Sequence, residues 1–249
     1  MVTGRHLIVN ADDLGLSHGV NLGIADAHDY GIVTSASLMV LQPQAEAAAE
    51  WAATRPRLSL GIHLDLCGWE YRDDVWIERY RRVDLHDARA VEAEVHRQLR
   101  IFQHLVGAMP THLDSHQHVH LEEPLDGIVL AIGRDLGVPV RDRTGVAYLG
   151  DFYGQTPKGV PLPDYISSSA LLALLTRLSD GWTELGCHPG YAEDTDDPYR
   201  AERRMELQAL CDLDVAAYIE SSDIELHSFV DTPQGELITP FIERERSTP

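Results

Sequence analysis

The sequence predicts a single α/β domain built around a parallel sheet of about seven strands. Short apolar runs alternate with longer segments of helical periodicity, which is the pattern of repeated β/α units. No repeat, low-complexity tract or linker interrupts the 249 residues, so residues 1–249 are expected to fold as one domain. Asp and His residues follow several of the expected strands, which is where a parallel barrel places its catalytic groups.

The expected strands are short apolar runs, and the expected helices lie between them. The strands are predicted at residues 6–10, 33–40, 58–63, 111–115, 138–141, 183–187 and 224–229. The helices are predicted at about residues 18–30, 43–54, 86–106, 122–136, 167–179 and 198–221. In the third helix, apolar residues recur every three or four positions from Val91 to Leu105 and define one buried face. Gly31, Gly107 and Gly137 are expected to end helices in a left-handed conformation.

Two segments between these elements are long and rich in aromatic residues. Residues 67–85 and 144–166 are expected to be ordered loops that form walls or lids over a site. The chain from Arg244 onwards is expected to fray.

The charge balance narrows the range of partners. The chain has 40 acidic and 20 basic residues, which gives a formal net charge of −20. Such a surface repels phosphate backbones and anionic lipids, so neither a nucleic acid nor a membrane is an expected partner. A small neutral or cationic substrate fits better. Lys158 is the only lysine, which argues against Schiff-base chemistry.

The cysteine pattern and the absence of long apolar runs indicate a cytoplasmic protein. Cys67, Cys187 and Cys211 are scattered and form no CxxC pair, so neither a disulfide framework nor a thiolate zinc site is expected. No run approaches the roughly 20 apolar residues of a membrane helix. The first residues do not have the pattern of a signal peptide.

Four motifs place Asp and His at the ends of expected strands. They are NADDLG at 10–15, GIH at 61–63, DSHQHVH at 114–120 and GCHPG at 186–190. Two adjacent carboxylates after a buried strand are costly unless a cation or a proton compensates them. Carboxylate oxygens and imidazole nitrogens are ligands for divalent metals. A metal beside a base and an acid suits hydrolysis of an amide or ester.

In their order along the chain, these motifs resemble those of the YdjC-like carbohydrate deacetylases. The resemblance is carried by LIVNADDLGLSHGVN, GIVTSASLM, LGIHLDL, THLDSHQHVH and ELGCHPGY, and it spans about residues 5–230. It implies a distorted (β/α) barrel related to the polysaccharide deacetylases. It also implies that one divalent ion, Mg²⁺ in preference to Zn²⁺, assists removal of an N-acetyl group. The implied substrate is a small carbohydrate, an amino sugar or short oligosaccharide such as the chitin disaccharide.

The resemblance also implies roles for individual residues. Asp13, His63 and His116 would hold the ion. Asp12 would be the general base and His188 the general acid, and we expect these two on opposite sides of the reacting carbonyl. Because side chains alternate along a strand, the two aspartates are expected to point in different directions.

Further polar residues are expected near this site. Asp114 is expected to orient a ligand histidine, and His118 to lie behind the ligands or contact substrate. Arg141 fits either an ion pair with Asp12 or a purely structural ion pair. Gln117 stands where some relatives have another histidine, which would alter contacts around the ligands. Of His116, His118 and His120, at most one or two are expected to point into the site. Eight other histidines are interpreted as ordinary surface or core residues: His6, His18, His28, His86, His96, His104, His112 and His227.

Other interpretations fit parts of the same pattern. A metal-dependent phosphoesterase on a similar barrel would hold two or three ions, but such enzymes place an HxH pair after the first strand. A non-catalytic carbohydrate-binding barrel would use the aromatic loops and need neither acid nor base. Asp12 and Asp13 could instead cap a helix, and His63 could be a buried core histidine. The sequence sets no oligomeric state and allows a homodimer.

Overall fold

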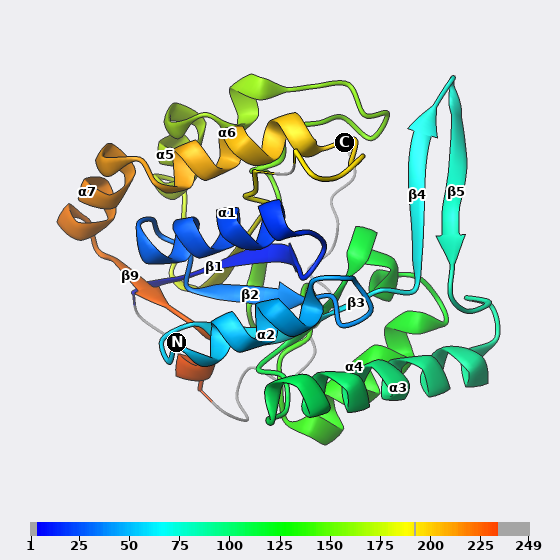
Figure 1. The fold of residues 1–249 in the computed structure, drawn as a ribbon. Coiled ribbons are helices and arrows are strands. Elements are labelled where there is room, and N and C mark those ends of the chain that lie inside the picture. The colour runs from blue at the N-terminus through cyan, green and yellow to red at the C-terminus, as the bar shows by residue number, and fades with distance from the viewer. Residues whose placement is uncertain (1–3, 192, 234–249) are drawn as a thin grey trace, which may run out of the picture.

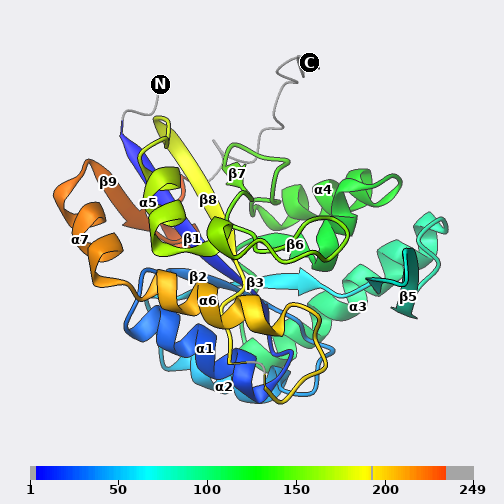
Figure 2. The ribbon, with the colours of Figure 1, turned by 90° about the horizontal axis from the view of Figure 1, so that it is seen from above.

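Strand β1 (Arg5–Leu14) lies at the centre of the sheet in the computed structural model, which describes residues 4–191 and 193–233. Eight of its ten residues are buried, as expected for a parallel strand that is covered on both faces. Strand β8 (Gly181–Cys187) pairs along one edge of β1. Along the other edge, β9 (Ile224–His227) pairs with the first half of β1 and β2 (Ser35–Leu38) with the second half (Figure 2).

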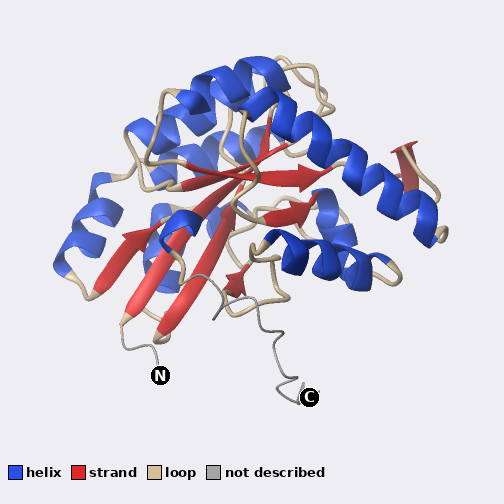
Figure 3. Cartoon of the chain, turned by 90° about the horizontal axis from the view of Figure 1, so that it is seen from below, coloured by secondary structure: helices blue, strands red, loops and turns tan. Residues whose placement is uncertain are grey.

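The other strands extend this sheet, and all of its pairings are parallel. The order is β6–β3–β2–β1–β8–β7, with β9 added beside β1. The additional strands are β3 (Ser59–Leu64), β6 (Leu113–Ser115) and β7 (Ala147–Leu149). The sheet curls into a half-barrel (Figure 3). No pairing joins β6 to β7 within the described residues, so the barrel is open there. The predicted α/β class and distorted parallel barrel are confirmed.

Helices cover the outer face of the curled sheet (Figures 1 and 3). They are α1 (His18–Asp29), α2 (Ala45–Ala53), α3 (Ala88–Val106), α4 (Leu125–Leu136), α5 (Ser168–Leu175), α6 (Arg200–Leu210) and α7 (Leu213–Ser221). Short 3-10 helices are η1 (His116–Leu121), η2 (Pro163–Ile166) and η3 (Phe229–Asp231). The apolar face predicted for α3 is confirmed, since Val91, Val95 and Phe102 are completely buried. None of the helices in the described part of the chain is both long and apolar enough to cross a membrane.

Two of the three glycines expected to end helices in a left-handed conformation do so. The side chain of Asp87 accepts hydrogen bonds from the first turn of α3. Gly107 and Gly137 end α3 and α4 with φ of 76° and 71°, as predicted. Gly31 does not have a left-handed backbone. It is needed because a Cβ there would lie 2.5 Å from the carbonyl oxygen of Leu210.

The segment 67–85 was expected to be a loop, but most of it is a β-hairpin. Strands β4 (Cys67–Arg72) and β5 (Val75–Arg81) pair in antiparallel fashion and extend to one side of the half-barrel (Figure 1). Asp73 and Asp74 have φ of 51° and 62°, as a type I′ turn requires. Asp-Asp signals this turn more weakly than Asn-Gly, and β5 is largely exposed, so the apolar alternation that marks a strand is missing.

Three other predicted elements need correction. The strand expected at 138–141 is reduced to a single bridge between Val140 and Leu113, because the chain turns away after Arg141. The helix expected at 198–221 is two helices, since Asp212 caps the start of α7. The loop expected at 144–166 contains β7 and η2. The tail predicted to fray lies outside the described residues.

Candidate active site

A β-bulge at the end of β1 places two neighbouring carboxylates in one cavity. The register between β1 and β2 shifts between Ala11 and Leu14, so Asp12 and Asp13 lie opposite a single residue of β2. Asp13 has a φ of 66°, which costs an L residue about 1–2 kcal/mol. Both residues are only 2% exposed. The bulge, rather than simple strand alternation, therefore makes them face different partners within the same cavity.

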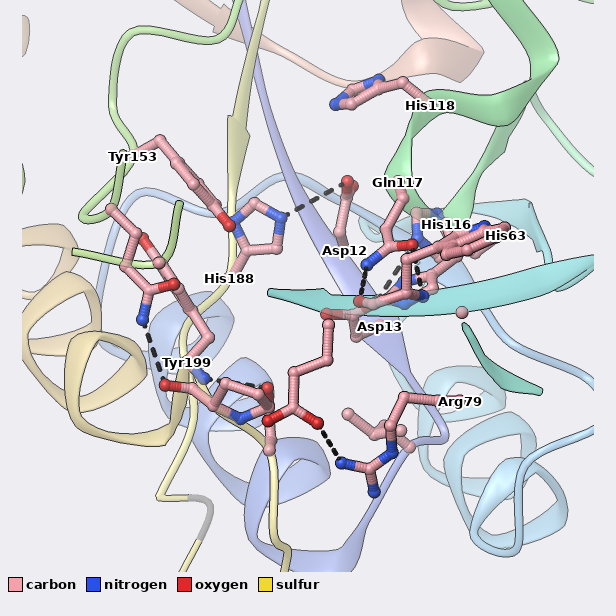
Figure 4. Close-up of a pocket in the computed structure, with 18 of the residues that line it drawn as sticks. Asp12, Asp13, His63, Arg79, His116, Gln117, His118, Tyr153, His188 and Tyr199 are labelled. Atoms are coloured by element: carbon pink, nitrogen blue, oxygen red, sulfur yellow. Dashed lines mark hydrogen bonds and ion pairs between the residues drawn. The ribbon is translucent and has the colours of Figure 1, made fainter. Parts of the chain in front are cut away.

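Asp13, His63 and His116 meet at the carboxyl ends of β1, β3 and β6 (Figure 4). Oδ1 of Asp13 lies 3.3 Å from Nε2 of His63 and 3.2 Å from Nδ1 of His116. The three ligand atoms all lie within 4.8 Å of one another. One carboxylate and two imidazoles at this spacing fit a divalent ion and leave positions for water and substrate. The sequence-predicted ligand set therefore converges in space.

Asp114 holds His63 in the orientation that a metal ligand needs. Nδ1 of His63 donates to Oδ1 of Asp114 at 2.7 Å, so Nε2 is directed at Asp13. Burial alone would lower the pKa of His63. The carboxylates of Asp114 and Asp12 outweigh this effect and raise that pKa well above its ordinary value. A cation that binds at Nε2 must therefore displace a proton.

Arg203 on α6 neutralises the other oxygen of Asp13. Its guanidinium contacts Oδ2 of Asp13 at 2.6 Å and also pairs with Asp197. Burial opposes ionisation, but Arg203 and the neighbouring histidines hold the pKa of Asp13 well below its usual range. Oδ1 is then the oxygen that faces the two histidines. Sequence reasoning missed Arg203. A visible signal was a charged residue on the same face of the predicted helix as Leu207 and Leu210.

Arg141 connects three buried carboxylates behind the ligands. It donates to both oxygens of Asp12 at 2.7 Å and lies 2.8 Å from Asp114 and 2.6 Å from Glu184. Burial works against ionisation of Asp12, but Arg141 and His63 hold its pKa below the ordinary value. Burial raises the pKa of Glu184 to about 7, even though Arg141 opposes the rise. Of the two interpretations of Arg141, the structure has the ion pair with Asp12, together with the pairs to Asp114 and Glu184.

Glu184 was not predicted from the sequence, although the sequence contains a signal for it. It is the charged residue in the otherwise uncharged strand β8, GWTELGC, and it is 1% exposed. A buried carboxyl group within a strand needs a partner. Glu184 therefore belongs to the buried charge network of the site.

His188 lies between Asp12 and Glu206. Its Nε2 is 3.8 Å from Oδ2 of Asp12 (Figure 4). Its Nδ1 is 3.8 Å from Oε1 of Glu206. Glu206 also accepts hydrogen bonds from the backbone N–H of His188 and the hydroxyl of Tyr199. Burial would lower the pKa of His188, but Glu206 and then Asp12 raise it above its ordinary value. Glu206 on α6 was also missed from the sequence.

A second possible ligand set, Asp12, His63 and Asp114, overlaps the first. Both of its carboxylates already pair with Arg141, and Asp114 also accepts a hydrogen bond from Ser37 at 2.6 Å. A cation there would meet the guanidinium. The set containing Asp13 and His116 is therefore the better metal site.

The site opens into a cavity of about 980 Å³. The hairpin contributes Trp69, Tyr71 and Trp76 to its wall, and Tyr148 and Tyr153 come from the segment that follows Arg141. Aromatic faces beside a few polar groups are typical of pockets for small organic ligands. The two segments predicted to be site walls do line this cavity.

Gln117 and His118 also border the cavity from the start of η1. Both have a left-handed backbone, with φ of 54° and 55°. The Gln117 amide accepts from the backbone N–H of Trp69 and donates to its carbonyl, which fixes the base of the hairpin. Burial lowers the pKa of His118 to about 4, so this imidazole is neutral at pH 7. Its Nδ1 is buried without a hydrogen-bond partner in the described part of the chain.

The fold and the site together define a class: a parallel (β/α) half-barrel with an Asp–His–His cluster, a carboxylate and a histidine at the carboxyl ends of its strands. Within that class, the sequence profile of the YdjC-like proteins matches residues 6–221. The chain belongs to the YdjC-like family.

Three similar proteins show how far this likeness extends. A carbohydrate deacetylase of Brevibacillus brevis is 34% identical over 90% of this chain and 98% of its own. A chitooligosaccharide deacetylase of Serratia marcescens is 30% identical over 90% and 98%. A solved structure from Enterococcus faecalis V583, provisionally described as a cellobiose-phosphate cleavage protein, superposes with a TM-score of 0.73. It is 26% identical and covers 92% of this chain and 98% of its own.

Proposed function

We propose that this protein is a divalent-metal-dependent deacetylase that removes the N-acetyl group from an amino sugar in a short oligosaccharide. The observation that carries the proposal is that Asp13, His63 and His116 face one another in the same cavity as Asp12 and His188. The activities named for the two curated relatives support the same reaction. The ion, when bound, supplies positive charge that polarises the amide carbonyl and makes a neighbouring water more acidic.

Asp12 is suited to the role of general base. Arg141 keeps its carboxylate ionised, while Asn10 and Arg141 hold it in one orientation. As the water oxygen bonds to the carbonyl carbon, Asp12 accepts the proton that the water releases. Asp13 is assigned the ligand role instead, because its Oδ1 faces both His63 and His116.

His188 is suited to the role of general acid. Glu206 and Asp12 favour its protonated form. As the C–N bond breaks, His188 donates its proton to the leaving nitrogen, which gives acetate and a free amine. The 3.8 Å between Nε2 of His188 and Oδ2 of Asp12 leaves no room for a carbonyl between them. The expectation that acid and base face each other across the carbonyl is therefore replaced by two groups that lie side by side.

The aromatic hairpin is suited to bind sugar rings. Trp76 lines the cavity and is 54% exposed, so its indole face is available to stack on a ring. A cavity of this size accommodates more than one sugar unit. We therefore infer a short oligosaccharide, such as the chitin disaccharide, rather than a long polymer.

Acetate release from a panel of N-acetylated mono- and disaccharides tests this function. We expect release from the diacetylated chitin disaccharide in the presence of Mg²⁺ or Zn²⁺ and its loss with a chelator. Trp76→Ala should raise KM for the disaccharide more than for the monosaccharide. Tyr165→Ala removes an aromatic residue that is also exposed but lies outside the cavity, so it should change neither value. No acetate release from any member with metal supplied would refute the proposal.

The alternatives give different results in the same experiments. A phosphoesterase would bind two or more Mg²⁺ per chain and release phosphate, whereas the deacetylase binds one. A non-catalytic carbohydrate-binding barrel would bind the disaccharide without releasing acetate. The two imidazole ligands also admit Zn²⁺, so metal reconstitution decides the ion. A cytoplasmic location, which fits the free thiols of Cys67 and Cys187, and a homodimer remain predictions.

A further inference from the structure

A second cluster of metal-binding side chains lies at the end of the sheet opposite to the cavity. His6 is near the start of β1, and Glu225 and His227 are on β9, which pairs in parallel with that part of β1. Six residues separate His6 from Asp12, and at strand spacing this corresponds to about 20 Å. The cluster is therefore independent of the candidate active site.

Three ligand atoms of this cluster form a nearly equilateral triangle. Nδ1 of His6 is 3.2 Å from Nε2 of His227 and 3.4 Å from Oε2 of Glu225. Nε2 of His227 is 3.2 Å from the same Glu225 oxygen. In a tetrahedral zinc site with bonds of about 2.0–2.1 Å, ligand atoms are about 3.3 Å apart. The triangle thus has the dimensions of one face of a zinc tetrahedron.

Hydrogen bonding alone does not satisfy this arrangement. A neutral imidazole carries one N–H, and that N–H can point well at only one of the two other corners. If both facing nitrogens carry hydrogens, the hydrogens approach each other. A cation at the centre instead accepts one lone pair from each corner, which matches the position of all three atoms.

The surroundings hold both imidazoles in place. The Trp182 ring stacks on His6 with centroids 4.8 Å apart and lies 4.9 Å from His227. Oδ2 of Asp231 is 4.0 Å from Nδ1 of His227, on the side of the ring away from the triangle. At this distance Asp231 is not hydrogen-bonded to the ring, but its carboxylate lies on the side where the outer carboxylate of a metal-bound histidine is found. The Glu225 side chain is 67% exposed, so an ion from solvent can reach the cluster.

We propose that His6, Glu225 and His227 form a zinc site that joins β9 to β1, with water in the fourth position. Two imidazole nitrogens and one carboxylate oxygen suit Zn²⁺, and the candidate active site, which has the same donor set, admits Zn²⁺ for the same reason. Because β9 pairs only with β1 within the described residues, this ion stabilises the attachment of the last strand. The net charge of −20 favours capture of a cation.

Zinc content of the full-length protein tests this site. The protein is stripped of metal and then dialysed against excess Mg²⁺ and free Zn²⁺ buffered at about 1 µM. We expect the wild type to retain one zinc more per chain than His6→Gln or His227→Gln. Glu225→Gln, an exposed and conservative change, should weaken zinc binding at least as much as loss of an outer-shell partner does, about 10- to 100-fold. The matched control His104→Gln, an exposed histidine on α3, should retain the wild-type content.

Two further measurements make the result specific to this cluster. Co²⁺ in the wild type should give the intense visible absorption of tetrahedral sites, and His227→Gln should lose the part that exceeds the contribution of the candidate active site, which the variant keeps. Zinc should raise the Tm of the wild type by about 5–10 °C more than that of His227→Gln. Acetate release with Mg²⁺ should be equal in both proteins, which separates this proposal from the proposed function. Equal zinc content in the wild type, His227→Gln and Glu225→Gln would overturn the site.

Discussion

Replacing Glu184 by Gln should make the protein more stable at neutral pH, although it removes one partner of a buried arginine. Arg141 carries one positive charge and faces three carboxyl groups, those of Asp12, Asp114 and Glu184. The first two have lowered pKa values and are ionised, whereas burial raises the pKa of Glu184 to about 7. One guanidinium cannot neutralise three carboxylates, so ionisation of Glu184 is what adds unbalanced negative charge to the cluster.

The magnitude follows from proton linkage. The unfolded chain releases the Glu184 proton near pH 4.5 and the folded chain near pH 7. The folded state binds this proton more tightly than the unfolded state does, which adds to the free energy of unfolding. That contribution is fully present below pH 4.5 and is lost as the pH rises to about 7. At about 1.4 kcal/mol per pKa unit, the loss is about 3 kcal/mol. The Gln side chain has the shape of the protonated acid and cannot ionise, so the variant does not undergo this loss.

The assay compares thermal unfolding of the wild type and Glu184→Gln at pH 5 and pH 8, with chelator present in both. The quantity compared is the Tm of the variant minus the Tm of the wild type. We expect this difference to be about 6–12 °C larger at pH 8 than at pH 5. His63 and His188 titrate in both proteins, so their contributions cancel in the difference. Glu220→Gln, an exposed change on α7, should show no such rise. A Tm difference for Glu184→Gln that stays constant with pH would refute the reasoning.

Three other changes probe the proposed catalytic and metal-binding groups. Asp12→Asn should keep the metal but lower kcat by about 100-fold or more, as measured by acetate release and metal content; near-normal turnover would exclude Asp12 as the base. His63→Ala should lose metal while keeping its circular dichroism spectrum, because His63 serves the ion; full metal affinity with a lower Tm would instead make it a core histidine. Glu206→Gln removes the charge that raises the pKa of His188, so the alkaline limb of the pH–rate profile should move to lower pH; an unmoved limb would contradict His188 as the acid.

The sequence determined those parts of the protein that depend on local pattern. Short apolar runs that alternate with segments of helical periodicity are sufficient to predict the parallel α/β class. The spacing of apolar residues in each segment shows whether a strand or a helix buries them. Asp13, His63 and His116 follow three different strands, and the carboxyl ends of parallel strands lie at one edge. Their convergence could therefore be predicted before any distance was known. The arginine at the end of an expected strand was likewise a visible partner for Asp12.

Only the tertiary structure decided which residues, distant in the sequence, pair with the buried charged groups of this site. Arg203 and Glu206 come from a helix that follows the ligand strands by more than eighty residues, and Glu184 meets Arg141 across the sheet. The bulge at Asp13 arises from a register shift between two strands, which neither strand shows alone. A one-dimensional pattern reports which residues are buried but not which residues they meet. In a low-dielectric interior, the identity of that neighbour sets whether a carboxyl group or an imidazole is charged.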